Sequence, residues 1–218
     1  MNWRLARCDA VQKFFFGAAA RRCNLAVGNR GVASVNPIAM TANQFAEKLR
    51  ACAPPVEKLR DQGVSAAGVE VIRKSYFCHF RGSASVQERE GPLFDLLEEY
   101  DLSGVDIGSV CFSNDVDRSG PKWRIGYFAE DWLVVEPQSG EIQVVDFSSN
   151  GHLLWECAEN GSRLLDALLL AAAFLGRCSW DTQLFNDQSA HQRAATECTK
   201  AAGGERYRDF YLVICGCD

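Results

Sequence analysis

The segment from Ile107 to Leu175 constrains the fold most, because it combines several short apolar stretches with one long apolar helix. Val, Ile, Phe and Trp recur in the short stretches, as is typical of β-strands. The expected strands cover residues 107–112, 123–128, 132–136 and 142–147, with 153–155 as a short strand at the edge. We therefore predict an antiparallel meander of about four to five strands.

The connections between these strands are rich in turn-forming residues. Residues 114–121 contain Asn, Asp, Ser, Gly and Pro, and Glu130 with Asp131 make a tight reversal. Pro137 and Gly140 belong to a four-residue connection between two strands. These reversals predict that successive strands are antiparallel neighbours.

The long helix is expected over residues 163–175, with the Asn-Gly-Ser sequence at 160–162 as its cap and Gly176 as its end. Because this helix is apolar nearly all round, it must be buried. It follows the meander directly. The helix is therefore expected to pack in the core beside the sheet.

Further helices are predicted on both sides of this segment. Thr41 and Gln44 fit a capping box at the start of the first helix, and Pro54 stops it. Ser65 and Pro92 have the positions expected for the starts of two more. The helices expected besides the first are a turn at 56–61 and longer helices at 65–76, 92–103, 181–201 and 206–214. A terminal strand over residues 210–215 is an alternative to the last helix.

These elements predict an α+β fold, in which a twisted antiparallel β-meander packs with N-terminal and C-terminal helices. At 218 residues and 47% hydrophobic content, the chain can bury one sizeable core, so residues 40–218 are expected to form a single domain. The most apolar window, 164–175, contains Asp166 and lies between Arg163 and Arg177. Because that window is too short and too charged for a membrane span, none is expected.

Charge is distributed unevenly along the chain. Residues 1–39 hold six Lys/Arg and one acid, whereas the rest holds 17 of the 23 basic and 27 of the 28 acidic residues, which is a net charge of about −10. The negative electrostatic field of residues 40–218 repels phosphate backbones and attracts basic partners. Direct binding to nucleic acid is therefore not expected.

The first 39 residues are basic, rich in Gly and Ala, and without a sustained helical or strand period. We expect a disordered N-terminal extension. A signal peptide would use Arg4 and Arg7 as its charged region and 14–20 as a short apolar region. A transit peptide is another alternative, and so is an upstream start codon ahead of the true start at Met40.

The ten cysteines are scattered and mostly stand among apolar residues. In a chain with a sizeable core, this pattern indicates reduced, buried thiols rather than a disulfide framework. The expected location is the cytoplasm.

The order of elements, with Ile125 and Gly126, the segment 132–146 and the capped helix 162–175, resembles the SUKH (Smi/Knr-like) superfamily. The end of the chain, with Gly203, Gly204 and the segment 210–216, is also similar to bacterial members. The resemblance implies helices at both ends of a twisted antiparallel sheet. For the bacterial immunity-protein branch it implies a binding protein that neutralises a toxin domain, often a nuclease, and no catalysis.

This resemblance leads to definite expectations about partners. The partner would be a basic protein toxin domain, whose active site is covered by the acidic protein. No cofactor or metal is expected, and the protein is expected to be monomeric. A regulatory or scaffold protein of the same fold, without a toxin partner, is the alternative within the same class.

Candidate binding residues are carboxylates and aromatic side chains at the ends of the predicted strands, a composition that suits an interface. They are Asp115, Asp117, Trp123, Glu130, Asp131 and Trp132. The aspartates could equally serve as turn formers, and the tryptophans, with Trp155, could be core residues. Glu98, Glu99 and Asp101 stand at a helix end where acids are unfavourable, which mildly favours a functional use.

An enzyme is the competing class of function. The candidate zinc ligands are Cys178, His191, Cys198, Cys215 and Cys217, but their spacing matches no zinc module. His79 beside Cys78 lacks an obvious third partner for nucleophilic chemistry. The sequence therefore favours a binding protein.

Overall fold

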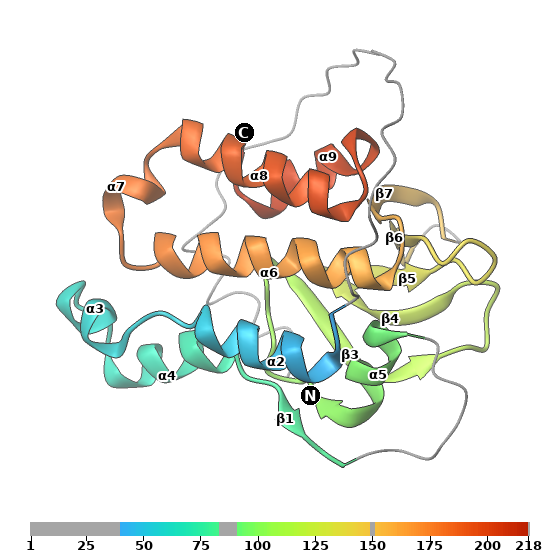
Figure 1. Cartoon of the computed structure of the whole chain (residues 1–218), viewed down its shortest axis with the longest axis horizontal. Helices are drawn as coiled ribbons and strands as arrows, with labels where there is room; N and C mark the ends of the chain where they lie inside the picture. The colour runs from blue at the N-terminus through green and yellow to red at the C-terminus, as the bar shows by residue number, and fades with distance from the viewer. Residues whose placement is uncertain (1–39, 83–90, 149–150, 218) are drawn as a thin grey trace.

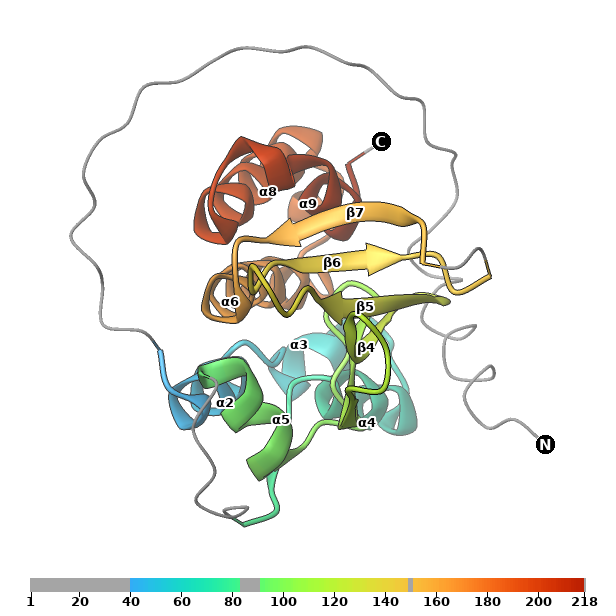
Figure 2. The ribbon, with the colours of Figure 1, turned by 90° about the vertical axis from the view of Figure 1, so that its right-hand side faces the viewer.

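The computed structural model describes residues 40–82, 91–148 and 151–217, and its α+β architecture confirms the predicted fold class (Figure 1). Its main sheet is antiparallel, with the strand order β3-β4-β5-β6-β7. The strands are β3 (Val110–Asp117), β4 (Trp123–Phe128), β5 (Asp131–Val135), β6 (Ile142–Val145) and β7 (Leu153–Ala158). Helices cover one face of this sheet (Figures 1 and 2). The extension predicted over residues 1–39 lies outside the described residues.

Three helices open the described part of the chain. They are α2 (Ala42–Ala51), α3 (Val56–Asp61) and α4 (Ala66–Lys74). The predicted capping box is present, since Gln44 N donates to Thr41 Oγ1 at 3.2 Å and Thr41 N donates to Gln44 Oε1 at 3.0 Å. On the inward face of α2, Phe45 and Leu49 are fully buried. Local sequence signals therefore predict this part well.

α5 (Pro92–Glu99) ends earlier than predicted, because the next residues form a strand. This strand, β2 (Tyr100–Asp101), pairs antiparallel with β1 (His79–Phe80) in a separate two-stranded sheet. Tyr100 is still buried, as its place in the helical pattern indicated. The sequence shows which side chain points inward but not that the backbone changes conformation.

Arg81 supplies the hydrogen bonds that the end of α5 needs. Its guanidinium donates to the carbonyls of Leu97 at 2.6 Å and Glu98 at 3.4 Å, and its main-chain N–H donates to Glu99 O at 2.7 Å. A cation is favourable at a helix carboxyl end, so it offsets the nearby glutamates. The carboxylate of Asp101 accepts hydrogen bonds that hold the following turn and β3. The contacts at Glu98, Glu99 and Asp101 therefore hold the end of α5 and the turn after it in place.

β3 differs from the prediction at both ends. It starts at Val110, because Ile107 forms only an isolated bridge with that residue. It then continues through residues predicted as a turn, with a register shift that takes up the irregular pairing. Asp117 pairs with Arg124 of β4, so Asp115 and Asp117 lie on a strand rather than on a loop.

α6 (Gly161–Cys178) runs through the middle of the helical layer, with α8 (Gln188–Ala202) and α9 (Arg208–Ile214) on one side and α2 on the other (Figure 1). Asn160 caps it, as predicted, by accepting from Arg163 N at 3.0 Å. The helix does not end at Gly176. A Cβ atom at that position would lie 2.4 Å from the carbonyl oxygen of Cys52, so glycine allows the end of α2 to approach α6 closely.

The C-terminal helices are more divided than predicted. They are α7 (Thr182–Phe185), α8 (Gln188–Ala202), the short 3-10 helix η1 (Glu205–Tyr207) and α9 (Arg208–Ile214). The predicted helix over 181–201 breaks at Asp187, whose side chain accepts from the main-chain N–H groups of Ser189 and Ala190 and so starts a new helix. The alternative of a strand over 210–215 is wrong, because Phe210 and Ile214 are buried on a helix.

Candidate partner-binding surface

The six predicted binding residues fall into different parts of the sheet. Trp123 lies on the helix-facing side, where its ring contacts Phe94 of the core at 5.8 Å between centroids. The guanidinium of Arg118 lies over the same Trp123 ring, 5.1 Å from its centroid. The structure thus places Trp123 as the core alternative describes, and Trp155 also packs against the core.

Asp117 and Trp132 meet on the outer face of the sheet through Arg124. The Arg124 guanidinium pairs with Asp117 Oδ2 at 3.0 Å and lies over the Trp132 ring at 5.4 Å. Hydrogen bonds from Ser119 lower the pKa of Asp117, and Arg124 adds to this effect. Asp115 is exposed on the same strand. Asp117 therefore serves as a turn former, the second role considered for it.

Glu130, Asp131 and Trp132 are brought together where β5 begins. Glu130 is exposed in the β4–β5 turn, while Asp131 is already the first residue of β5 and pairs with Phe128. Asp131 Oδ1 accepts from the main-chain N–H of Phe147 at 3.4 Å. The end of β6 therefore lies beside the start of β5 (Figure 2).

Exposed apolar side chains gather at the same end of the sheet. Phe147 is 52% exposed, Leu153 39% and Leu154 37%. Trp132 and Leu153 flank the buried Val145 from the two neighbouring strands. We call this region the hairpin-end surface, and it consists of Glu130, Asp131, Trp132, Phe147, Leu153 and Leu154.

The sequence predicts strands that include Phe147 and Leu153 but offers no reason to select these residues for binding. Alternation tells which residues share a face of a strand. It does not tell which of the two faces the helices cover, and Trp132, Val145 and Leu153 share the outer one. Exposure of a large apolar residue in the folded chain is the signal that was missing.

The other half of the outer face is closed by a network of ionic hydrogen bonds. The Arg206 guanidinium contacts Glu156 at 2.5 Å and Glu141 at 3.0 Å, Gln143 donates to Glu141 at 3.0 Å, and Lys122 donates to Gln143 at 2.6 Å. The hydrogen bond from Arg206 lowers the pKa of Glu156. These charges satisfy one another, which leaves the hairpin end as the more open part of this face.

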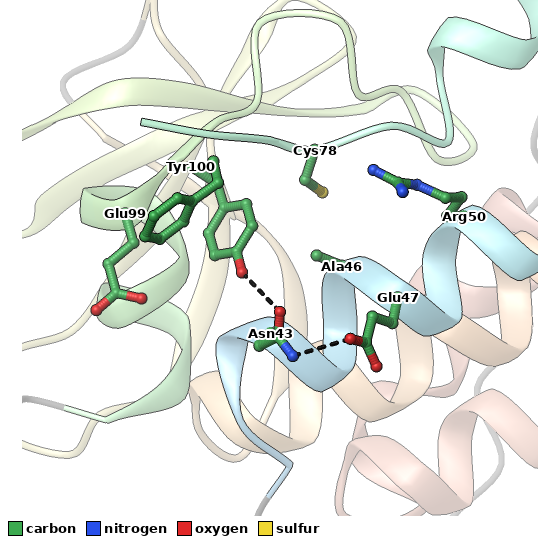
Figure 3. Close-up of a pocket in the computed structure, with 8 residues that line it drawn as sticks. Asn43, Ala46, Glu47, Arg50, Cys78, Glu99 and Tyr100 are labelled. Atoms are coloured by element: carbon green, nitrogen blue, oxygen red, sulfur yellow. Dashed lines mark hydrogen bonds between the residues drawn. The ribbon is translucent and has the colours of Figure 1, made fainter. Parts of the chain in front are cut away.

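A cavity of about 390 Å³ lies between α2 and the β1–β2 sheet (Figure 3). Much of its polar lining is already bonded, since Tyr100 Oη donates to Asn43 Oδ1 at 3.2 Å and Asn43 Nδ2 donates to Glu47 Oε1 at 3.0 Å. Burial raises the pKa of the Cys78 thiol to about 12, although nearby Arg50 acts in the opposite direction. A thiol that stays protonated at neutral pH is a poor nucleophile. This cavity therefore gives little support to thiol catalysis.

The cysteines and histidine near the C-terminus do not form a metal site in the described residues. His191 Nδ1 lies 2.5 Å from the carbonyl oxygen of Cys215, and Nε2 lies 2.9 Å from that of Phe185. Both ring nitrogens thus face main-chain oxygens. Cys198 and Cys215 hydrogen-bond to each other, and both are free thiols with fully buried side chains. The arrangement stabilises the packing of α8 against the chain end.

No protein-family model, curated protein or solved structure matches this chain. Across residues 40–82, 91–148 and 151–217, none of the helices has the length and apolar character needed to cross a membrane. Function therefore has to be inferred from the chemistry of the surfaces described above.

Proposed function

We propose that this protein is an immunity-type binding protein of the SUKH kind, which neutralises a basic toxin domain by covering its active site. The observation that carries the proposal is the hairpin-end surface. There, an exposed phenylalanine and two exposed leucines stand beside Glu130 and Asp131, in the part of the chain, residues 40–218, that carries a net charge of about −10. Aromatic and apolar anchors with charges around them are typical of protein interfaces.

The charge of the chain suits a nuclease domain as partner. A nuclease active site must hold phosphate groups, so its surface is basic, and an acidic protein can occupy it without doing chemistry. Opposite fields also speed the encounter of the two proteins at low salt. Inhibition should therefore be stoichiometric and should weaken as salt screens the charges.

An immunity gene should lie beside the gene of its toxin, so coexpression with the product of the adjacent gene tests this proposal. We expect the adjacent product alone to stop growth of a bacterial host, and coexpression to restore it. The purified proteins should form a 1:1 complex in which the activity of the partner is lost. A tight complex should weaken by about tenfold or more when the salt concentration is raised from about 0.05 to 0.5 M.

Two results would contradict the proposal. One is an adjacent product that is harmless when expressed alone, which would favour the regulatory alternative. The other is a toxic product whose activity is unchanged by a molar excess of this protein. Val71→Ser, at another exposed apolar residue, is a suitable control for the surface variants described below.

A further inference from the structure

The cavity between α2 and the β1–β2 sheet has a buried, largely apolar floor and an aromatic mouth. Its floor consists of Ala46, Cys78 and Tyr100, all of which are buried. Phe80 lies at the mouth, where its side chain is 62% exposed and its ring packs edge-on against Tyr100, with centroids 5.4 Å apart. The volume of about 390 Å³ lies within the range of sites that enclose small organic molecules, about 300–1,000 Å³.

The guanidinium of Arg50 points into this cavity, toward Cys78 (Figure 3). It lies over the Phe77 ring, 5.3 Å from the centroid, and this contact holds it in place. Among the residues that the structure describes, it makes no ion pair and finds no hydrogen-bond acceptor. A guanidinium that is held in place but has no acceptor is suited to binding a carboxylate through two parallel hydrogen bonds.

The two glutamates that line the cavity do not supply this acceptor. Glu47 accepts a hydrogen bond from Asn43 Nδ2 at 3.0 Å instead. Glu99 lies on the far side of Tyr100 from Arg50, and its carboxylate points away from the guanidinium (Figure 3). Both glutamates still carry negative charge near the cavity, so they disfavour a ligand with two or more negative charges.

The charge of the surrounding chain also favours an anion. Residues 40–82, which supply most of the lining, hold seven basic and four acidic residues, whereas residues 91–217 hold nine basic and twenty acidic residues. Arg73 places a second guanidinium near the Phe77 ring, 5.8 Å from its centroid. The field around the cavity is therefore more favourable to an anion than the field of the rest of the protein.

We infer that this cavity binds a small aromatic monocarboxylate, which is a binding activity separate from the proposed function. The carboxylate of the ligand pairs with the Arg50 guanidinium, and its ring lies against Phe80, Tyr100 and the buried floor. One negative charge matches the single guanidinium of the lining, and burial of the ring adds affinity. The site shares no residue with the hairpin-end surface.

Calorimetric titration of the full chain with phenylacetate tests this inference. We expect a dissociation constant of about 0.1 mM, as is reasonable for a ligand of few atoms. Phenylacetamide has nearly the same shape but no charge, so it should bind about tenfold more weakly or worse. Benzyl phosphate carries nearly two negative charges at neutral pH, and it should bind no more tightly than phenylacetate because of the two glutamates.

Protein variants test the role of Arg50. Arg50→Met keeps an unbranched side chain that can pack on Phe77 but removes the charge, so it should weaken binding of phenylacetate by about tenfold or more. Arg50→Lys should restore part of the affinity, because it returns the charge without the planar fork. Arg60→Met is the matched control, since Arg60 is exposed on α3 outside the cavity, and it should leave binding unchanged.

Two further measurements separate binding at this cavity from indirect effects. Melting curves without ligand should be the same for the original protein and the Arg50 variants, because Arg50 is exposed and bonds to no other residue of the described chain. In a nuclear magnetic resonance titration with phenylacetate, the amide signals of Ala46 and Cys78 should shift, while those of Phe147 and Leu153 on the hairpin-end surface should not.

Several results would overturn the inference. Absence of binding at about 5 mM phenylacetate would do so, and so would equal affinity for phenylacetate and phenylacetamide. Unchanged affinity of Arg50→Met would show that the guanidinium does not bind the carboxylate. Tighter binding of benzyl phosphate would refute the choice of a monocarboxylate, and signals that shift only at the hairpin-end surface would refute the choice of this cavity.

Discussion

Replacing Gly176 with alanine sets two opposing effects against each other. Alanine is favoured over glycine inside a helix by about 1 kcal/mol, so the change would stabilise an isolated α6. In the folded protein, however, the new Cβ would lie 2.4 Å from the carbonyl oxygen of Cys52. Close C···O contacts in proteins are about 3.3 Å or longer, so one of the two helices would have to move by about 1 Å.

Packing should win this competition. The atom in the way belongs to the main chain of the residue that ends α2, so it cannot rotate aside as a flexible side chain could. Overpacking of this kind costs about 1–3 kcal/mol, and the shift would also disturb Phe45 and Leu49 in the core. With the gain of about 1 kcal/mol in helix propensity subtracted, we expect the free energy of unfolding to fall by up to about 2 kcal/mol.

Urea denaturation followed by circular dichroism measures this change, provided that the slope of the unfolding free energy against urea concentration is the same for the variant and the original protein. Ala173→Gly is the matched control, because Ala173 is exposed on the same helix. It should cost about 1 kcal/mol through helix propensity alone. If Gly176→Ala instead raised the free energy of unfolding by about 1 kcal/mol, the close approach of α2 to α6 would be refuted.

Three further changes have defined outcomes. The hydrogen bond from Arg206 lowers the pKa of Glu156. The interaction therefore stabilises the fold at pH values above the ordinary glutamate pKa of about 4.5, and this stabilisation is lost as the pH falls through the lowered pKa. Arg206→Ala should therefore reduce the stability at pH 7 and make the stability less dependent on pH as the solution is acidified. Unfolding curves measured between about pH 3 and 7 test this, and a pH profile unchanged by the substitution would contradict it. His191→Phe removes the imidazole N–H that donates to one of the two main-chain carbonyls, which should cost about 1–3 kcal/mol. An unchanged urea midpoint would argue against that hydrogen bond. Phe147→Ser should weaken binding of the toxin partner by about tenfold without loss of stability, whereas the control Val71→Ser should not. If calorimetry finds equal affinity for the two variants, the hairpin-end surface is not the binding site.

Features of the fold that depend on neighbouring residues in sequence were predictable. The capping box of Thr41 and Gln44 and the cap at Asn160 each require only a few adjacent side chains. The strand over Trp123–Phe128 was predicted with its observed limits, since polar turns bound it on both sides. Gly176 shows where this approach fails. The reason for its glycine is a carbonyl far away in the sequence, so a local pattern interprets it as a helix end.

The binding surface was predictable only in part. Glu130, Asp131 and Trp132 are adjacent in sequence and therefore stay together in any fold that keeps the β4–β5 turn. Trp123 separates from them because it lies on the helix-facing side of the sheet, and the side on which a residue lies depends on strand parity. Register shifts in β3 and β4 change that parity, and the sequence gives no sign of them.

The bonds made by Arg206 also set the order in which the protein can be completed during synthesis. Glu141 and Glu156 emerge from the ribosome well before Arg206, which lies 65 and 50 residues further along the chain. Until then, a nearly buried carboxylate of Glu141 lacks its cation, and the side of α6 that α8 later covers is bare. The nascent chain thus carries exposed apolar surface until its last helices arrive, and such surface makes an incomplete chain prone to aggregation.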